Sequence, residues 1–444
     1  MLEYIYILLH VSLFVFLVLP FVNVLIAQFR KQENIPEIIP VDKMEEVHES
    51  VNQKMAVAAN RPSEEEAIVS IQRDFACIIT AYKNADIAMP LVESLLVQNY
   101  EQPEEKQPFI YLVADECDIS NLLEKTQHWD KERVMILKPE SPLRLKAKSI
   151  IHAMENFKRE HDTTVVFDAD NLAHPNFLKE LNRYFHAGFE AVQGQRTAKN
   201  LDTVYACADS TGEIYKNYIE RYVPYLLGSS AVISGSGMAV ETALYWDYLN
   251  SKEIQEGKKQ WKKMLQEDKI LQNHLLKKDV RIAYAKNAIV YDEKVTTAEQ
   301  VETQRTRWLY SYFQNMPNSL NILGRGIRNM SFNQILFGMI TITPPLFILV
   351  FFAAFVGLLD VLIDPFWTFV LYSGLGIFGM NVLWVLHLSK APKAVWNKLW
   401  GLPLFVLKQV TALFKMRNPN KNFKHTEHNR TYNIKEVMSE VGES

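Results

Sequence analysis

Three long runs of apolar residues dominate the pattern of hydrophobic and polar positions along the chain. No Asp, Glu, Lys or Arg occurs within residues 4–29, 329–359 or 365–389. About 20 apolar residues in a helix cross the ~30 Å hydrocarbon core of a bilayer. We therefore predict three transmembrane helices, the first in residues 1–29 and the second and third as a hairpin in residues 331–390. The first run fits a cleaved signal peptide poorly, because it lacks a basic start and a small-residue cleavage pattern before Arg30.

Basic residues beside these runs predict an orientation, because Lys and Arg gather in cytoplasmic flanks. The turn at residues 358–364 and the N-terminus before the first run hold neither Lys nor Arg. We expect the N-terminus outside, the long middle region in the cytoplasm, a hairpin out and back, and the C-terminus inside, as in a multi-pass protein of the cell (inner) membrane. The basic flanking residues are Arg30, Lys31, Arg325, Arg328, Lys390, Lys393 and Lys398.

The pattern divides the rest of the chain into further segments. Residues 30–73 read as a polar linker, and residues 74–310 as one folded domain. Aromatic and basic residues in 311–330 suit the headgroup zone of a membrane. In the final segment, 391–444, the apolar run 399–407 is too short to span. We expect this run to lie at the interface and a cytoplasmic tail to follow it.

Short apolar runs alternate with helical patterns from residue 75 onward. Strands are expected at 75–80, 109–114, 134–137 and 163–167, and helices at 90–99 and 147–157. This alternation predicts an α/β fold with a mostly parallel sheet. Ligands of such sheets bind at the carboxyl ends of the strands. Asp115 and Asp168 fall at such ends and are therefore candidate site residues.

Composition excludes one class of partner. The formal net charge is −3, which gives no electrostatic basis for binding nucleic acid. The three cysteines, Cys77, Cys117 and Cys207, are widely spaced and show no metal-ligand pattern. Free thiols in a reducing compartment are the plain interpretation, in agreement with the cytoplasmic placement.

Two acidic pairs carry candidate chemistry. Asp168-Ala169-Asp170 places two hard oxygen ligands just past a buried strand, where they could hold Mg²⁺ or Mn²⁺ together with a diphosphate. An ordinary Asp-rich turn is the alternative. Glu267-Asp268 begins a helical pattern and could supply a general base. Acidic residues favoured by the helix dipole are the alternative there.

A third candidate is Gln304-x-x-Arg307-Trp308, at the start of the segment leading to the second apolar run. The Arg side chain offers a bidentate fork for phosphate or carboxylate. The Trp ring offers a flat apolar face for a sugar. An aromatic and basic anchor beside the membrane would look the same.

In this order, the elements resemble those of the membrane-integrated inverting glycosyltransferases of family 2, which include cellulose, chitin and hyaluronan synthases and bacterial polysaccharide enzymes. Their pattern is Asp, Asp-x-Asp, Glu-Asp and Gln-x-x-Arg-Trp. The run Gly235-Ser236-Gly237-Met238 adds a lesser match. The resemblance covers residues 74–308 and implies a GT-A-like nucleotide-sugar-binding domain on a three-span membrane platform with interfacial helices.

The resemblance also implies roles for individual residues. Asp268 would be the catalytic base, and Mg²⁺ or Mn²⁺ would be held by Asp168 and Asp170. The chain departs from the family pattern at Lys83, Glu116 and Leu145, which affects the detail of the donor site. A loose match at Phe423, Thr426 and His428 resembles a gating loop. Donor binding would involve Tyr82, Asp115, Lys146, Asp168, Asp170, Gln304 and Arg307, and acceptor binding Glu267, Trp308 and Gly237.

The expected function is transfer of a sugar from a nucleotide-sugar, with UDP as the expected nucleotide, to a saccharide or lipid-linked acceptor in polysaccharide biosynthesis. Three spans are few for a polymer channel, so a homo-oligomer or an export partner could complete one. The alternative is a non-catalytic subunit of a polysaccharide assembly complex that has kept the fold. A transporter is disfavoured, because the predicted spans hold no acidic or basic residue.

Overall fold

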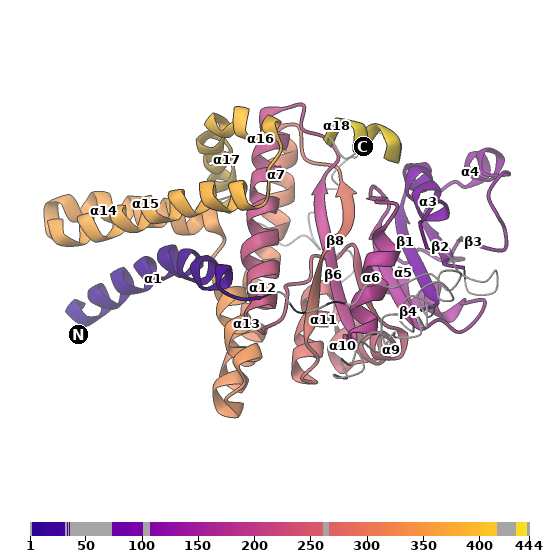
Figure 1. Ribbon diagram of the computed structural model, residues 1–444, viewed down its shortest axis with the longest axis horizontal. Helices are drawn as coiled ribbons and strands as arrows, with labels where there is room; N and C mark the ends of the chain where they lie inside the picture. Colours follow the sequence, from indigo (N-terminus) through magenta and orange to yellow (C-terminus); the bar gives the residue numbers. More distant parts are fainter. Residues whose placement is uncertain are drawn as a thin grey trace, which may run out of the picture.

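The computed structural model describes residues 2–31, 33, 35, 73–100, 107–260, 266–414 and 432–441. Most of the predicted linker, residues 36–72, and the possible gating residues Phe423, Thr426 and His428 lie outside this set. Figure 1 shows a sheet flanked by helices at one end of the molecule and a group of long apolar helices at the other.

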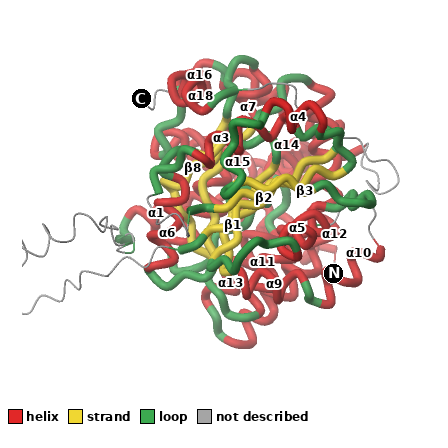
Figure 2. Tube along the Cα trace, turned by 90° about the vertical axis from the view of Figure 1, so that its right-hand side faces the viewer, coloured by secondary structure: helices red, strands yellow, loops and turns green. Residues whose placement is uncertain are grey.

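One sheet with the strand order β3-β2-β1-β4-β7-β6-β8-β5 organises the domain. The four predicted strands are present as β1, β2, β3 and β4, and they pair in parallel. Figure 2 shows helices on both faces of the strands. The bounds are β1 Phe75–Tyr82, β2 Phe109–Asp115, β3 Val134–Leu137, β4 Thr163–Asp168, β5 Leu172–Ala173, β6 Ala191–Ala198, β7 Met238–Glu241 and β8 Ile282–Asp292.

The prediction of a mostly parallel sheet was wrong for the second half, which is mixed. Strand β7 runs antiparallel to both β4 and β6, and β5 runs antiparallel to β8, whereas β6 and β8 are parallel. The chain turns into β7 through Gly235 and Gly237, which have φ of +79° and +63°. Glycine adopts this region without a steric penalty, so the turn can deliver β7 antiparallel to β4.

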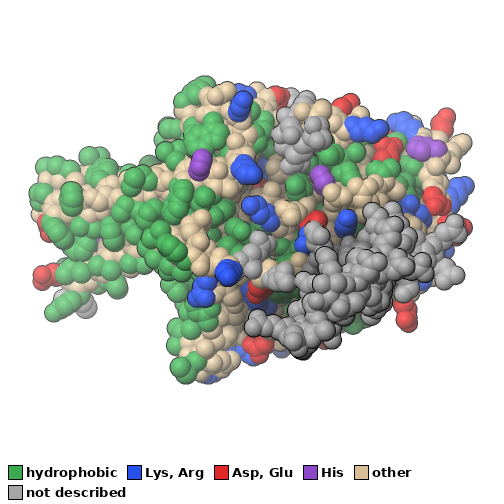
Figure 3. Space-filling view, viewed as in Figure 1, with side chains coloured by type: hydrophobic (Ala, Val, Ile, Leu, Met, Phe, Trp, Pro, Cys, Tyr) green, Lys and Arg blue, Asp and Glu red, His purple; other side chains and the backbone are tan. Residues whose placement is uncertain are grey.

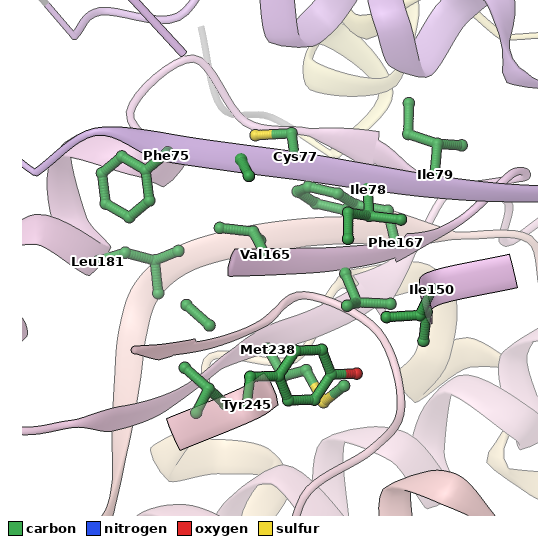
Figure 4. Packing of buried hydrophobic residues seen from close by; sticks show 14 of the residues in the cluster. Phe75, Cys77, Ile78, Ile79, Ile150, Val165, Phe167, Leu181, Met238 and Tyr245 are labelled. Carbon is green, nitrogen blue, oxygen red and sulfur yellow. The ribbon is translucent and has the colours of Figure 1, made fainter. Parts of the chain in front are cut away.

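Burial on both faces of the sheet explains why the first strands are continuous apolar runs. All seven residues of β2 are buried, as are the first five of β1. Figure 4 shows Phe75, Ile78, Val165 and Phe167 packed against neighbouring apolar side chains. Full burial of each such side chain contributes about 1.5–3 kcal/mol. Strands covered on both faces read as unbroken apolar runs, which made them visible in the sequence.

Helices cover the sheet and lead from it to the apolar group. The short helices of the domain are η2 Asp86–Ala88, α3 Met89–Leu96, α4 Ser120–Lys125, α5 Lys146–Glu155, α6 Phe177–His186, α9 Thr242–Leu249, α10 Lys252–Gln260 and α11 Glu267–Lys277. Helix α7 Val204–Lys216 continues through a π-helical turn, η4 Asn217–Tyr222, into α8 Val223–Leu226. Toward the C-terminus follow α16 Lys393–Asn397, η5 Leu399–Gly401, α17 Leu402–Phe414 and α18 Ile434–Val441.

Helix α12, Ala298–Asn329, is one continuous helix across the predicted boundary at residue 310. It begins with a capping box, in which Thr297 and Gln300 satisfy each other's backbone N–H groups. It then folds back onto α13, Phe332–Ile342. A Cβ on Gly326 would lie 2.7 Å from the backbone nitrogen of Ile335, so only glycine allows this approach. Whether residues 311–330 lie at a membrane interface remains a prediction.

Three helices are long and apolar enough to cross a membrane by length and composition: α1 Leu2–Gln28, α14 Leu346–Ile363 and α15 Pro365–Leu388. The second uncharged run does not form one long helix. It is split into α13 and α14 around Pro344 and Pro345, because proline cannot continue a helix past its first turn. The candidate second span is therefore α14 alone. Figure 3 shows mainly hydrophobic side chains on the surface at this end of the molecule.

The expectation that the spans hold no acidic or basic residue was wrong at one position. Asp360 lies inside α14, where it is buried, and not in the following turn. Its carboxylate accepts a hydrogen bond of 2.6 Å from Tyr6, and lies 2.6 Å from Nε2 of His10, both in α1. The polar group therefore has partners from a neighbouring helix, which is how such groups persist among apolar side chains.

Candidate active site

A cavity of about 1100 Å³ joins the carboxyl edge of the sheet to the apolar helices. On one side it reaches the ends of β1 and β4 and the start of α5. Its middle is walled by α7, η4, α11 and α12, and its far side by α1, α13, α14 and α15. Of the predicted site residues, the cavity is lined by Tyr82, Lys146, Asp168, Asp170, Glu267, Asp268, Gln304, Arg307 and Trp308.

Two predicted residues lie elsewhere. Asp115 is buried and does not line the cavity. Its two carboxylate oxygens accept hydrogen bonds from the backbone N–H groups of Leu143 (2.9 Å) and Arg144 (2.6 Å). In this structure Asp115 therefore holds the loop before α5. Gly237 does not line the cavity, although Gly235 does, and a Cβ on Gly237 would lie 2.9 Å from the Val290 side chain.

The edge of the sheet next to Tyr82 holds an unusual backbone. Lys83, Glu116 and Arg144 all have φ between 53° and 65°, although none is glycine. The Arg144 guanidinium forms two hydrogen bonds of 3.0 and 3.1 Å with the Glu116 carboxylate. Burial and then the neighbouring Glu116 raise the pKa of Tyr82. Such backbone conformations cluster at ligand sites, and Lys83 and Glu116 are also positions where the chain departs from the family pattern.

Lys146 connects the acidic strand end to the glycine turn. Its ammonium donates to Asp168 Oδ1 at 2.5 Å and to the backbone oxygen of Gly235 at 2.6 Å. Burial alone would lower the pKa of Lys146. The carboxylates of Asp168, Glu267 and Asp268 outweigh burial and raise it. The side chain is thus a fixed cation at the point where the acidic residues converge.

The pair Asp168 and Asp170 fits a divalent cation that is shared with a ligand. Both residues line the cavity, and Lys199 donates to the backbone oxygen of Asp170. No cluster of three or more His, Cys, Asp or Glu suited to a metal occurs among the residues that the structure describes. Mg²⁺ is commonly bound by one or two carboxylates plus substrate phosphates and water. Two carboxylates therefore suffice if a diphosphate supplies the remaining oxygens.

Glu267 and Asp268 open α11 against the glycine turn. A Cβ on Gly235 would lie only 3.4 Å from Asp268 Oδ2, so the turn approaches this carboxylate closely. Asp268 Oδ1 accepts from the backbone N–H of Lys269 at 2.8 Å. Burial, opposed by Lys146 and reinforced by the Asp268 charge, raises the pKa of Glu267 to about 7. The two adjacent carboxylates of Glu267 and Asp268 thus line the same cavity.

Gln304, Arg307 and Trp308 lie on one face of α12, as their spacing of three and four residues requires. Burial lowers the pKa of Arg307. Sequence reasoning missed Arg305, which forms an ion pair with Asp209 and stacks 4.2 Å from the centre of the Trp308 ring. It also missed Lys216, whose ammonium lies 5.3 Å from the same ring. Arg305 occupies an unspecified position within the motif, and Lys216 is almost a hundred residues away in the sequence.

A buried network of charges underlies this wall of the cavity. Asp292 pairs with Arg196 and with Lys294 (2.8 Å), and Glu213 pairs with Arg221 at 3.0 Å. The cations hold the pKa of Glu213 below its usual value, although burial opposes this. These residues come from β6, α7, η4 and the end of β8. No short motif contains them, so only the fold brings them together.

The sequence profile of the glycosyltransferase like family 2 matches residues 72–311, more than half of the chain. The chain belongs to this family. It is therefore a glycosyltransferase, and the resemblance seen in the motifs is confirmed at family level. The mixed α/β sheet is consistent with the GT-A fold.

Solved structures similar to this glycosyltransferase include a mannosyltransferase from Pyrobaculum calidifontis in complex with GDP-Man and Mn²⁺. It is 11% identical, with a TM-score of 0.46, and the match covers 83% of this chain and 95% of that one. S. aureus TarS 1-349 is 14% identical, with a TM-score of 0.39 and coverage of 80% and 93%. A complex of the same TarS fragment with UDP-GlcNAc has a TM-score of 0.35 at 14% identity, with coverage of 56% and 66%. Among curated protein sequences, none matches this chain.

Proposed function

We propose that this glycosyltransferase transfers a sugar from a nucleoside diphosphate sugar, with UDP as the expected nucleotide, to an acceptor hydroxyl with inversion at the anomeric carbon. One observation carries the proposal. A single cavity contains Lys146 with the two aspartates at the strand end, Asp268 on α11, and Arg307 on α12. This is the set of groups that a displacement at a sugar diphosphate requires.

The donor would occupy the sheet side of the cavity. Tyr82 and the loops beside it, which hold residues at positive φ, would border the base, and Asp115 fixes the loop before α5. Lys146, Gln304 and Arg307 would bind the diphosphate through charge-assisted hydrogen bonds. Asp168 and Asp170 would hold Mg²⁺ or Mn²⁺ there. When bound, the cation would offset the negative charge of the departing diphosphate.

The acceptor would approach from the side of α11 and α12. The Asp268 carboxylate would remove the proton of the acceptor hydroxyl, whose oxygen then bonds to the anomeric carbon while the bond to the diphosphate breaks. Attack from the face opposite the nucleotide inverts the anomer. Glu267 and Trp308 would border the acceptor, and the close approach of Gly235 would limit the positions open to the Asp268 carboxylate.

We further propose that α1, α14 and α15 cross the inner membrane, with the catalytic domain on the cytoplasmic side. Their length and apolar composition support crossing. The basic residues at their domain-facing ends support the orientation. Introduced cysteines at residues 33 and 433, tested with an impermeant thiol reagent in sealed vesicles, should report the same side, and opposite sides would contradict this topology.

A donor screen tests the proposed reaction. The full chain in membranes is incubated with a panel of nucleotide sugars, and release of the nucleoside diphosphate is measured. We expect one donor to be preferred and Asp268→Asn to reduce turnover by about 10²–10⁴-fold, with donor binding retained. Asp247→Asn is a matched control, because this exposed carboxylate on α9 lies outside the cavity.

A non-catalytic assembly subunit predicts a different result, namely no turnover with any donor. The presence of Lys146, Asp268 and Arg307 in one cavity favours the catalytic alternative. Equal activity of Asp268→Asn and the unmodified protein would show that Asp268 is not the catalytic base.

A further inference from the structure

The cavity is lined by charged residues near the sheet and by uncharged, mostly apolar residues near the long helices, and this difference indicates the class of acceptor. Beyond Trp308 its walls come from α1, α13, α14 and α15. None of the lining residues contributed by these four helices is charged, within the described part of the chain. They include Phe16, Leu19, Leu346, Val350, Phe378 and Val382.

This apolar part suits a hydrocarbon chain better than a glycan. Each sugar of a polysaccharide carries several hydroxyl groups, and leaving such groups without hydrogen bonds costs about 1–3 kcal/mol each. Asn23 is the one amide among the residues that α1, α14 and α15 contribute to the wall. Because these are also the helices with the length of membrane spans, a lipid chain could enter this part from the bilayer.

Two cations lie beside Trp308, between the apolar part of the cavity and the part that holds Asp268. Lys216 and Arg305 both face the Trp308 ring, at 5.3 and 4.2 Å. Arg305 is paired with Asp209, and the nearby Glu213 is paired with Arg221. Lys216 has neither a hydrogen bond nor an ion pair with the residues that the structure describes. Burial lowers the pKa of Lys216, although the charge of Glu220 partly opposes this. A negatively charged group beside Trp308 would compensate this cation.

We propose that the acceptor is a saccharide joined to a long-chain lipid through a phosphate or diphosphate. The lipid chain occupies the apolar part between α1, α14 and α15. The phosphate is bound by Lys216 with Arg305 beside it, and the acceptor hydroxyl reaches Asp268. This inference rests on the proposed function, whose donor side remains bound by Lys146 and Arg307.

An acceptor comparison tests the inference. The full chain is assayed in nanodiscs with its preferred donor and one saccharide in three forms: linked to a polyisoprenyl diphosphate, linked to a short water-soluble phosphate ester, and free. We expect the lipid-linked form to have a kcat/KM at least about tenfold higher than the free form, since it adds both apolar burial and a charged contact. Equal kcat/KM for all three forms would overturn the proposal, as would preference for the free glycan. The short ester separates phosphate recognition from chain recognition, and its equality with the lipid-linked form would overturn the apolar site.

Matched variants locate the two parts of the acceptor. Lys216→Gln should raise KM for the lipid-linked acceptor about tenfold or more without changing donor affinity, whereas Lys258→Gln on α10 should change neither. Val350→Trp should fill the apolar part and raise the same KM, whereas Val361→Trp, on the exposed side of α14, should not. Unchanged KM in both Lys216→Gln and Val350→Trp would overturn the proposal.

Donor affinity, measured by calorimetry with the intact nucleotide-sugar, shows that each variant is folded. It also separates two failures. If the donor binds and is slowly hydrolysed, but lipid linkage has no effect on transfer, the proposed function stands and the lipid acceptor is wrong. If no donor binds or turns over, both are wrong.

Discussion

The imidazole of His10 in α1 lies 2.6 Å from the carboxylate of Asp360 in α14, and both side chains are buried. Tyr6 donates to the second oxygen of the same carboxylate. His10 also packs against Trp367 of α15, with the two rings tilted and their centroids 4.8 Å apart. One polar cluster thus joins all three long apolar helices near the end farthest from the sheet.

We predict that Asp360→Leu destabilises the assembled helices, because it leaves the buried His10 and the half-buried Tyr6 without their acceptor. Breaking a buried pair in this way costs about 3–5 kcal/mol. The apparent melting temperature of the full chain in detergent should fall. Adding Tyr6→Phe and His10→Leu to the variant should restore most of the loss, because no unsatisfied group then remains. A triple variant as unstable as the single one would contradict this explanation, and Glu3→Gln serves as an exposed control.

We predict that the stability of the domain falls as the pH rises from about 4.5 to about 7. The pKa of Glu267 is raised from 4.5 to about 7 by burial, so the folded state binds this proton more tightly than the unfolded state does. Below pH 4.5 both states are protonated and the contribution is complete. Between the two values only the unfolded state loses the proton, so stability is lost until the folded state also ionises.

Thermal unfolding between pH 4 and 8 measures this effect. Glu267→Gln should flatten the curve over the same pH interval, since the amide does not titrate. If the variant and the unmodified chain show the same pH dependence, another group is responsible.

We predict that turnover depends on Mg²⁺ or Mn²⁺ and that Asp170→Ala removes most of it. Both carboxylates line the cavity, where they could hold a cation that is shared with a diphosphate. Activity should vanish in excess chelator and return when the metal is added back. Full activity in chelator would contradict the prediction, and unchanged metal dependence in Asp170→Ala would remove this residue from the site.

We predict that Arg307→Ala and Trp308→Ala affect different substrates. Arg307 supplies a charged fork, so its loss should weaken the affinity for the nucleotide-sugar by about 1.5–3 kcal/mol. The Arg305 guanidinium lies over the Trp308 ring. Loss of the ring should therefore weaken acceptor use and leave donor affinity nearly unchanged. Separate affinity measurements for donor and acceptor test this division. If Trp308 is only a membrane anchor, Trp308→Leu should retain full activity.

The sequence predicted those parts of the molecule that depend on local pattern. The four parallel strands were visible because each is buried on both faces, and the motif residues because they follow a strand or begin a helix. Asp115 is the one motif aspartate that does not line the cavity, and its carboxylate accepts hydrogen bonds from backbone N–H groups of a loop 28 residues later. A contact of that kind has no signal in the local sequence.

The parts that could not be predicted depend on distant contacts. The chain enters the antiparallel strand β7 through two glycines at positive φ, which a sequence shows only as a small-residue run. The pairing of His10 with Asp360 joins residues 350 positions apart. Lys216 and Arg305 both contact Trp308 because α7 and α12 line the same cavity. The sequence of either helix does not indicate that it lies beside the other.

The π-helical turn between α7 and α8 gives the chain a place where its length can vary. A π turn holds one residue more than an α turn, so removing one residue from 217–222 can be absorbed by a return to α geometry. The same deletion inside α12 would rotate everything beyond it by about 100°. Lys216, Ile219, Glu220 and Arg221 line the cavity at or beside this turn. Insertions and deletions here would therefore alter what the enzyme recognises while leaving its architecture intact, which makes this turn a natural point for specificity to diverge among related chains.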